Sequence, residues 1–139
     1  MRALSVFLIA FFASFSPGHG APVTGNELLE ACTGEDVTQA AFCAVYIDGV
    51  RDGLVGGSIN SMQSVGAKFD DIADFNYAVN LMLGFCISEQ SAAEQQKDAV
   101  VDHLQRNPGS LYVNAHRLVL RAFREAFPCT EDLVTQPPE

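Results

Sequence analysis

The chain has 139 residues, of which 48% are hydrophobic, and seventeen acidic residues stand against eight lysines and arginines, giving a net charge of -9. This excess of negative charge argues against binding to nucleic acid or to an anionic membrane surface, because both would repel the protein. It favours either the solubility of an exported domain or a basic partner.

Residues 1–20 have the layout of a secretory signal peptide. A positive start is followed by an apolar run over 3–15 and by a helix-breaking Ser16-Pro17-Gly18. The run is too short to span a bilayer, and no later stretch reaches the roughly 20 apolar residues that spanning needs. Cleavage after Gly20 would place small residues at both key positions. We therefore expect an exported single domain over 21–139 that lacks a membrane anchor after cleavage.

The first part of the mature chain predicts two helices. Thr24 and Glu27 stand three residues apart before two leucines, which is the capping-box signature and predicts a short helix over 25–31. A longer helix is predicted to begin near Asp36 and to fade at Gly56-Gly57. Its apolar residues recur at helical spacing and form one packed stripe of Ala40, Cys43, Ile47, Val50 and Leu54.

Two further features of this part of the chain are a glycine within the long helix and a group of carboxylates after it. Gly49 lacks a side chain at a point where another element could approach closely. From 58 to 74 the apolar pattern weakens, which predicts a short helical turn followed by a loop. Within it, Asp70, Asp71 and Asp74 are the candidate partner-binding residues, and the alternative is that they form a solvated helix start.

Three segments of the second half have helical spacing. The residues Phe75, Ala78, Val79, Met82 and Leu83 predict a buried helix over 75–85. Ser91 and Glu94 form a second capping box before a helix that ends at Asn107-Pro108. Ser110 is the predicted cap of the last helix, which carries an inward stripe of Leu111, Ala115, Leu118, Val119, Ala122 and Ala126. The fold class that follows is an all-α bundle of four to five helices.

Three arginines, Arg117, Arg121 and Arg124, lie together on the outer flank of this last helix and reverse the charge of the chain locally. We expect them to pair with Asp98 and Asp102 across antiparallel helices. The alternative is that they meet an acidic patch on a second copy and help to set a dimer.

Catalytic patterns are few. His103 follows Asp102 and His116 precedes Arg117, and neither histidine has a partner at motif spacing. The chain has no serine nucleophile elbow and no His-Glu-x-x-His zinc pair. The sequence therefore predicts no catalytic residue, no metal site and no cofactor.

Four cysteines, Cys32, Cys43, Cys86 and Cys129, lie in the exported part. An even number of cysteines in an oxidising compartment predicts two disulfides, for which three connectivities are available. No two cysteines have the Cys-x-x-Cys spacing of a redox or zinc motif.

The order of these short motifs resembles the Rap/Tai family, the immunity proteins that protect bacteria from type VI secretion amidase effectors. The segments that carry the resemblance are Gly25-Asn26-Glu27-Leu28-Leu29 before Cys32, Cys43 to Val50 with Asp52, Phe85-Cys86, Val100-Val101 with Leu104 and Asn107-Pro108, and Ala122-Phe123 with Ala126 to Cys129. The chain departs from the family in the length and polarity of 58–74.

The resemblance implies a small disulfide-stapled helical protein of the Gram-negative periplasm, often a homodimer. It implies binding to a secreted peptidoglycan amidase, whose active site the protein would occlude, and it implies no catalysis. A periplasmic chaperone or structural helper without an effector partner is the alternative function.

The position of Cys43 in the long helix bears on the disulfide pairing. If that helix starts near Asp36, Cys43 lies roughly 10 Å along the axis from the turn that holds Cys32. A disulfide joins Cα atoms that are at most about 7 Å apart. We therefore expect Cys43 to pair with Cys86, and Cys32 to pair with Cys129.

Overall fold

The computed structural model describes residues 21–87 and 91–129, and the predicted signal segment lies outside them. Within the described ranges every regular element is a helix, which confirms the all-α bundle. The elements are α1 (Gly25–Thr33), α2 (Val37–Ser64), α3 (Ile72–Leu83), α4 (Ala93–Arg106), the 3-10 helix η1 (Pro108–Ser110) and α5 (Ala115–Ala126). None of the described helices is long and apolar enough to cross a bilayer.

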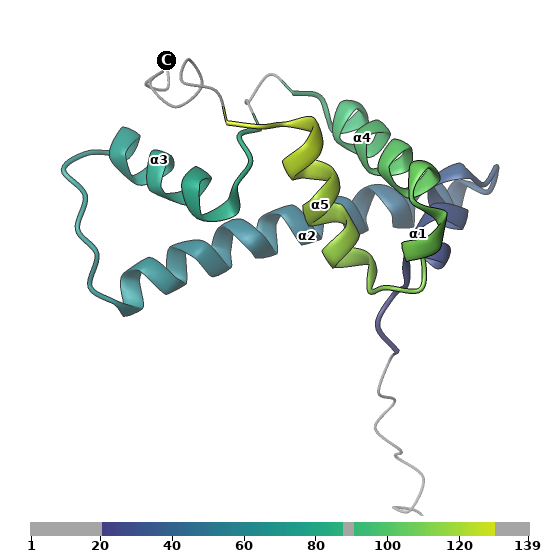
Figure 1. The fold of residues 1–139 in the computed structure, drawn as a ribbon, viewed down its shortest axis with the longest axis horizontal. Helices are drawn as coiled ribbons and strands as arrows, with labels where there is room; N and C mark the ends of the chain where they lie inside the picture. The colour runs from purple at the N-terminus through teal and green to yellow at the C-terminus, as the bar shows by residue number, and fades with distance from the viewer. Residues whose placement is uncertain (1–20, 88–90, 130–139) are drawn as a thin grey trace, which may run out of the picture.

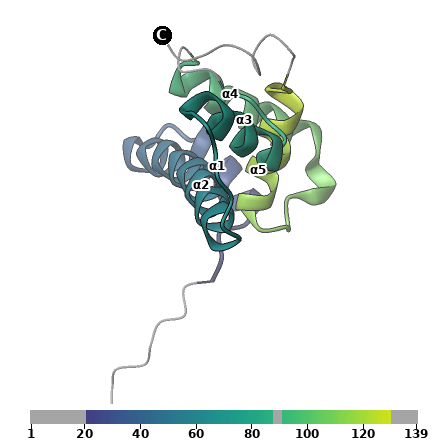
Figure 2. The same cartoon turned by 90° about the vertical axis from the view of Figure 1, so that its left-hand side faces the viewer.

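The long helix α2 runs along the whole domain, and the other helices pack on it in two groups (Figures 1 and 2). Helices α1, α4 and α5 cover its N-terminal and middle parts, whereas α3 lies along its C-terminal part. The largest fully buried side chains belong to the first group and to α2, and they are Phe123, Leu28, Leu104, Leu118, Val100, Val119 and Cys43.

The start of α1 is fixed by the predicted capping box. The backbone N–H of Thr24 donates to Glu27 Oε2 at 2.7 Å, and the backbone N–H of Glu27 donates to Thr24 Oγ1 at 3.4 Å. Gly25 is buried directly after the cap, and a Cβ there would lie 2.5 Å from the side chain of Leu118. Because Gly25 has no side chain, the start of α1 packs closely against α5 and against the residues that precede α5. The backbone N–H of Gly25 donates to Val113 O at 3.0 Å.

Helix α2 extends beyond its predicted end. It continues through Gly56-Gly57 to Ser64, so the prediction that it fades at the two glycines was wrong. Each glycine costs about 1 kcal/mol of helix propensity. Ser58 and Met62, which lie beyond the glycines, are buried, and this burial offsets the cost. The prediction of a close approach at Gly49 was also wrong, because a Cβ there would meet no other atom within 4 Å.

The starts of the last two helices also differ from their predicted positions. The N-cap of α4 is Ala92, without a side-chain cap, so Ser91 and Glu94 do not form the predicted capping box. The N-cap of α5 is Asn114, whereas Ser110 belongs to η1. A backbone bridge between Thr24 and Asn114 holds the α5 start beside α1 and accounts for the later beginning. The inward stripe of α5 is confirmed at Ala115, Leu118, Val119 and Ala122, but Ala126 is exposed and Phe123 is buried instead.

Two disulfides are present, and their pairing differs from the predicted one. Cys32 pairs with Cys43 at a Cα separation of 5.0 Å, and Cys86 pairs with Cys129 at 4.8 Å. The predicted pairing considered only the distance along α2. Gly34 and Asp36 both have extended backbones, so the link carries the chain away from Cys32 before α2 runs back past it. This outward step offsets the distance that Cys43 gains along the helix.

Candidate binding surface

The three predicted partner-binding carboxylates lie at the start of α3. Asp71 is the N-cap of this helix, and its Oδ1 accepts the backbone N–H of Asp74 at 2.9 Å. Asp70 and Asp74 are exposed, and Asp74 lies in the first turn, where a negative charge interacts favourably with the helix dipole. Asp71 therefore has a structural role, while the side chains of Asp70 and Asp74 are presented to solvent. Their binding role stays a prediction.

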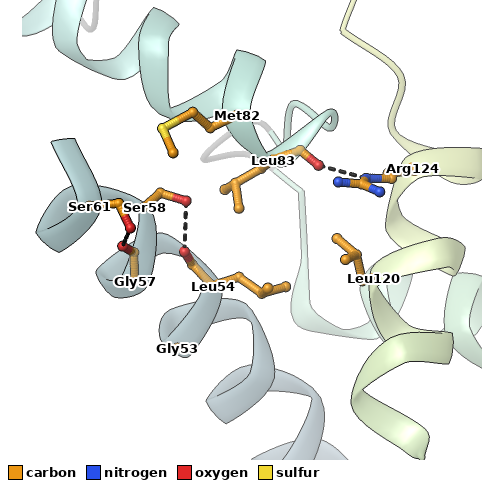
Figure 3. Close-up of a pocket in the computed structure, with 9 residues that line it drawn as sticks. All are labelled: Gly53, Leu54, Gly57, Ser58, Ser61, Met82, Leu83, Leu120 and Arg124. Carbon is orange, nitrogen blue, oxygen red and sulfur yellow. Dashed lines mark hydrogen bonds between the residues drawn. The ribbon is translucent and has the colours of Figure 1, made fainter. Parts of the chain in front are cut away.

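At the other end of α3, a shallow open pocket of about 340 Å³ lies between α2, α3 and α5 (Figure 3). Its walls are mostly apolar, and one of the lining side chains is charged. The lining residues are Gly53, Leu54, Gly57, Ser58 and Ser61 of α2, Met82 and Leu83 of α3, and Leu120 and Arg124 of α5.

The charged residue of this pocket is held in place by the end of α3. Arg124 Nε donates to the carbonyl oxygen of Leu83 at 2.7 Å, and Figure 3 shows the guanidinium beside this oxygen with Leu120 below it. Gly84 ends α3 in the left-handed conformation, with φ 72°. A Cβ on Gly84 would lie 3.1 Å from Arg124 Nε, so the glycine also leaves room for the guanidinium.

The serine hydroxyls of the pocket are turned towards their own helix. Ser58 Oγ donates to Leu54 O at 3.0 Å, and Ser61 Oγ donates to Gly57 O at 2.8 Å. Each hydroxyl has a single hydrogen, so both oxygens are left as hydrogen-bond acceptors. The pocket thus combines fixed acceptors on α2 with cationic donors on α5.

The predicted pairing of the three α5 arginines with α4 was wrong. Asp102 pairs with Arg106 of its own helix at 2.8 Å, and Arg106 also reaches Glu125 of α5 at 3.5 Å. Arg117 and Arg121 are exposed and pair with no carboxylate among the described residues. Helix periodicity placed the three arginines on one flank but could not show that Arg124 donates to Leu83 of α3 instead of pairing with α4.

The buried His103 also joins α4 to α5. Its side chain is 5% exposed, and its Nδ1 lies 2.9 Å from Glu125 Oε2. A carboxylate can only accept, so Nδ1 donates this hydrogen bond. Within the described structure Nε2 has no hydrogen-bond partner. The hydrogen bond from His103 lowers the pKa of Glu125. No nucleophile contacts this pair in the described residues, and we assign it to helix packing.

No pattern in the sequence had predicted this pocket. Gly53 and Gly57, four residues apart on one helix face, were a usable signal, because small residues at this spacing leave a groove on a helix. The residues that complete the pocket come from α3 and α5, which are distant in sequence, and no local pattern joins them to α2. The described residues contain no cluster of histidine, cysteine and carboxylate side chains that could hold a metal ion.

A family model described as Rap1a immunity proteins matches residues 24–129. The match begins at the cap of α1 and ends at Cys129, so it includes every described helix and both disulfides. The chain belongs to this family. No curated protein and no solved structure matches it. Family membership implies an immunity protein that binds a secreted effector, and such a role is inhibitory rather than enzymatic. Proteins of this family typically act outside the cytoplasm.

Proposed function

We propose that this protein is a periplasmic immunity protein that binds a peptidoglycan amidase of a type VI secretion system and occludes its active site. The family match over 24–129 is the observation that carries the proposal. The signal-peptide layout of 1–20 and the two disulfides support an oxidising compartment such as the periplasm. Peptidoglycan lies in the same compartment.

The fold supplies a rigid frame for such an inhibitor. One disulfide joins α1 to α2, and the other joins the segment after α3 to the segment after α5. A surface that is already ordered loses little conformational entropy on binding. The proposed contact is the start of α3, where Asp71 holds the helix turn while Asp70 and Asp74 meet the effector.

Substitution of the acidic segment tests this contact. Asp70→Asn with Asp74→Asn removes both presented charges and leaves the Asp71 cap intact. The control is Asp98→Asn, which removes an exposed charge from α4. We expect the double variant to bind a cognate amidase at least about tenfold more weakly, whereas the control binds normally. Unchanged affinity of the double variant removes the segment from the interface.

The oligomeric state is a separate part of the proposal. The resemblance to the Rap/Tai family implies a homodimer. Sedimentation velocity at several protein concentrations measures this state directly. The proposed dimer predicts a dimer mass at micromolar concentration, and a monomer mass throughout would contradict it.

A chaperone function is the second candidate, and the exposed apolar face of α3 favours it. Tyr77, Leu81 and Met82 are 41%, 56% and 50% exposed. Such side chains could hold an unfolded client. A light-scattering assay decides between the two functions. Suppression of client aggregation without effector binding would replace the immunity function by the chaperone.

A further inference from the structure

We propose that the pocket between α2, α3 and α5 receives an acidic side chain from the protein partner, with Arg124 pairing with its carboxylate. This inference rests on the proposed function for the identity of the partner, the effector. It concerns a different surface from the acidic start of α3. It assigns a second contact to the arm formed by α3 and the C-terminal part of α2 (Figure 1).

The donor geometry of Arg124 favours a carboxylate. A guanidinium has five N–H donors in a fixed plane, and the Nε donor is used by Leu83 O. The two terminal nitrogens keep their donors, and no described residue supplies an acceptor for them. They can therefore hold both oxygens of a carboxylate in a bidentate pair. Because the Leu83 contact already fixes the plane of the guanidinium, little entropy is lost when the pair forms.

The charge distribution around the pocket points in the same direction. None of the lining residues is acidic, although the whole chain has a net charge of -9. Arg121 and Arg117 follow Arg124 along the flank of α5 and also lack a carboxylate partner in the described structure. This flank is therefore a cationic region on an acidic protein, and it complements an anionic segment.

The shape of the pocket favours a protein segment over a small molecule. Small-molecule sites enclose most of the surface of their ligand, whereas this pocket is shallow and open. Its leucines and Met82 can contact the methylene groups of a glutamate, and these apolar walls strengthen the ion pair by reducing its exposure to water. The oxygens of Ser58 and Ser61 can accept backbone N–H groups of the same segment.

Filling the pocket tests the proposal without removing Arg124. A Cβ on Gly57 would meet no atom within 4 Å, and Gly57 lines the pocket. We therefore expect Gly57→Leu to fold, to raise the helix propensity and to project a side chain into the pocket. The matched control is Gly49→Leu, on the same helix, at an equally open position outside the pocket. We expect Gly57→Leu and Arg124→Gln to bind the effector at least about tenfold more weakly, and Gly49→Leu to bind normally. Normal binding by Gly57→Leu would overturn the proposal and leave the proposed function intact.

A second measurement needs no effector. N-acetyl-glutamate methylamide is titrated into the labelled protein while the Arg124 Nε–H resonance is followed, with N-acetyl-glutamine methylamide as the uncharged control. The proposal predicts a shift of this resonance with the glutamate probe alone, and loss of the shift in Gly57→Leu. Equal shifts with both probes, or none, would overturn it.

Together the two measurements distinguish a failure of the proposed function from a failure of the carboxylate pocket. If the wild-type protein binds no effector but shows the glutamate-specific shift, the proposed function fails while the carboxylate pocket stands. Self-association that Gly57→Leu abolishes and Gly49→Leu does not would identify a second copy as the occupant, and it would overturn the assignment to a foreign partner.

Discussion

Arg124 donates a hydrogen bond from Nε to the carbonyl oxygen of Leu83 at 2.7 Å, which joins α5 to the last turn of α3. The last carbonyl groups of a helix lack partners within the helix and carry partial negative charge. A guanidinium at this point satisfies one of them and complements the dipole. The contact matters because α3 otherwise packs mainly on α2.

Removal of this contact is expected to loosen α3. Arg124→Met keeps the apolar stem of the side chain and removes the donor, and hydrogen bonds from charged groups contribute about 1.5 to 3 kcal/mol. We therefore expect faster amide hydrogen exchange over 72–83 and little change in α4. Arg121→Met is the control, because Arg121 is exposed and forms no ion pair with a carboxylate in the part of the chain that the structure describes. Equal exchange in both variants would show that the Leu83 contact does not hold α3.

The glycine that ends α3 has two roles that a pair of variants can separate. Gly84 and Gly66 both have positive φ, 72° and 70°. Alanine in this conformation costs about 1 to 2 kcal/mol at either site. A Cβ on Gly84 would also press on Arg124, whereas a Cβ on Gly66 would meet nothing within 4 Å. Denaturant unfolding should therefore show a larger loss of stability for Gly84→Ala than for Gly66→Ala. A larger loss at Gly66 would contradict this account.

The two disulfides are expected to differ in their contribution to stability. They close loops with sequence separations of 11 and 43. The loop-entropy relation gives about 3 kcal/mol for the shorter loop and about 4 kcal/mol for the longer one. Cys86→Ser with Cys129→Ser should therefore cost more than Cys32→Ser with Cys43→Ser in denaturant unfolding. Mass analysis of a non-reduced digest checks the pairing, and a peptide joining Cys43 to Cys86 would refute it.

Glu125 predicts a pH dependence of stability. Hydrogen bonding to His103 lowers the pKa of its carboxyl in the folded state below the ordinary value of 4.5. The folded protein thus binds fewer protons than the unfolded chain over this range. The stabilisation is complete above pH 4.5 and is lost as the pH falls through the lowered folded pKa.

Glu125→Gln should accordingly be less stable than the wild type at pH 7, with the difference shrinking at acidic pH. Thermal unfolding followed at several pH values measures this trend. Glu30→Gln is the control, because the exposed Glu30 side chain pairs with no described residue. A difference that grows on acidification would have the wrong sign for this account.

Much of the fold could be predicted from local patterns. The capping box of Thr24 and Glu27 and the apolar spacing of α5 depend on neighbours within one or two turns, and both are confirmed. The end of α2 could not be placed in this way. Glycine propensity is a weak local term, and it was overridden by the burial of Ser58 and Met62.

The errors in the binding surface and the disulfides arise from relationships between elements. The pairing of Cys32 with Cys43 depends on the direction in which the link at Gly34 leaves α1. The environment of Arg124 depends on where α3 ends beside α5. The spacing of residues within one helix determines neither the direction of the link at Gly34 nor the position of the end of α3 beside α5.

The central claim is that this protein neutralises a secreted effector by binding it. The most direct measurement is the rate at which a cognate amidase effector hydrolyses purified peptidoglycan, with increasing amounts of the mature protein. The account predicts that hydrolysis falls in proportion to added protein and stops near equimolar concentration. Full hydrolysis in the presence of a large molar excess would contradict it.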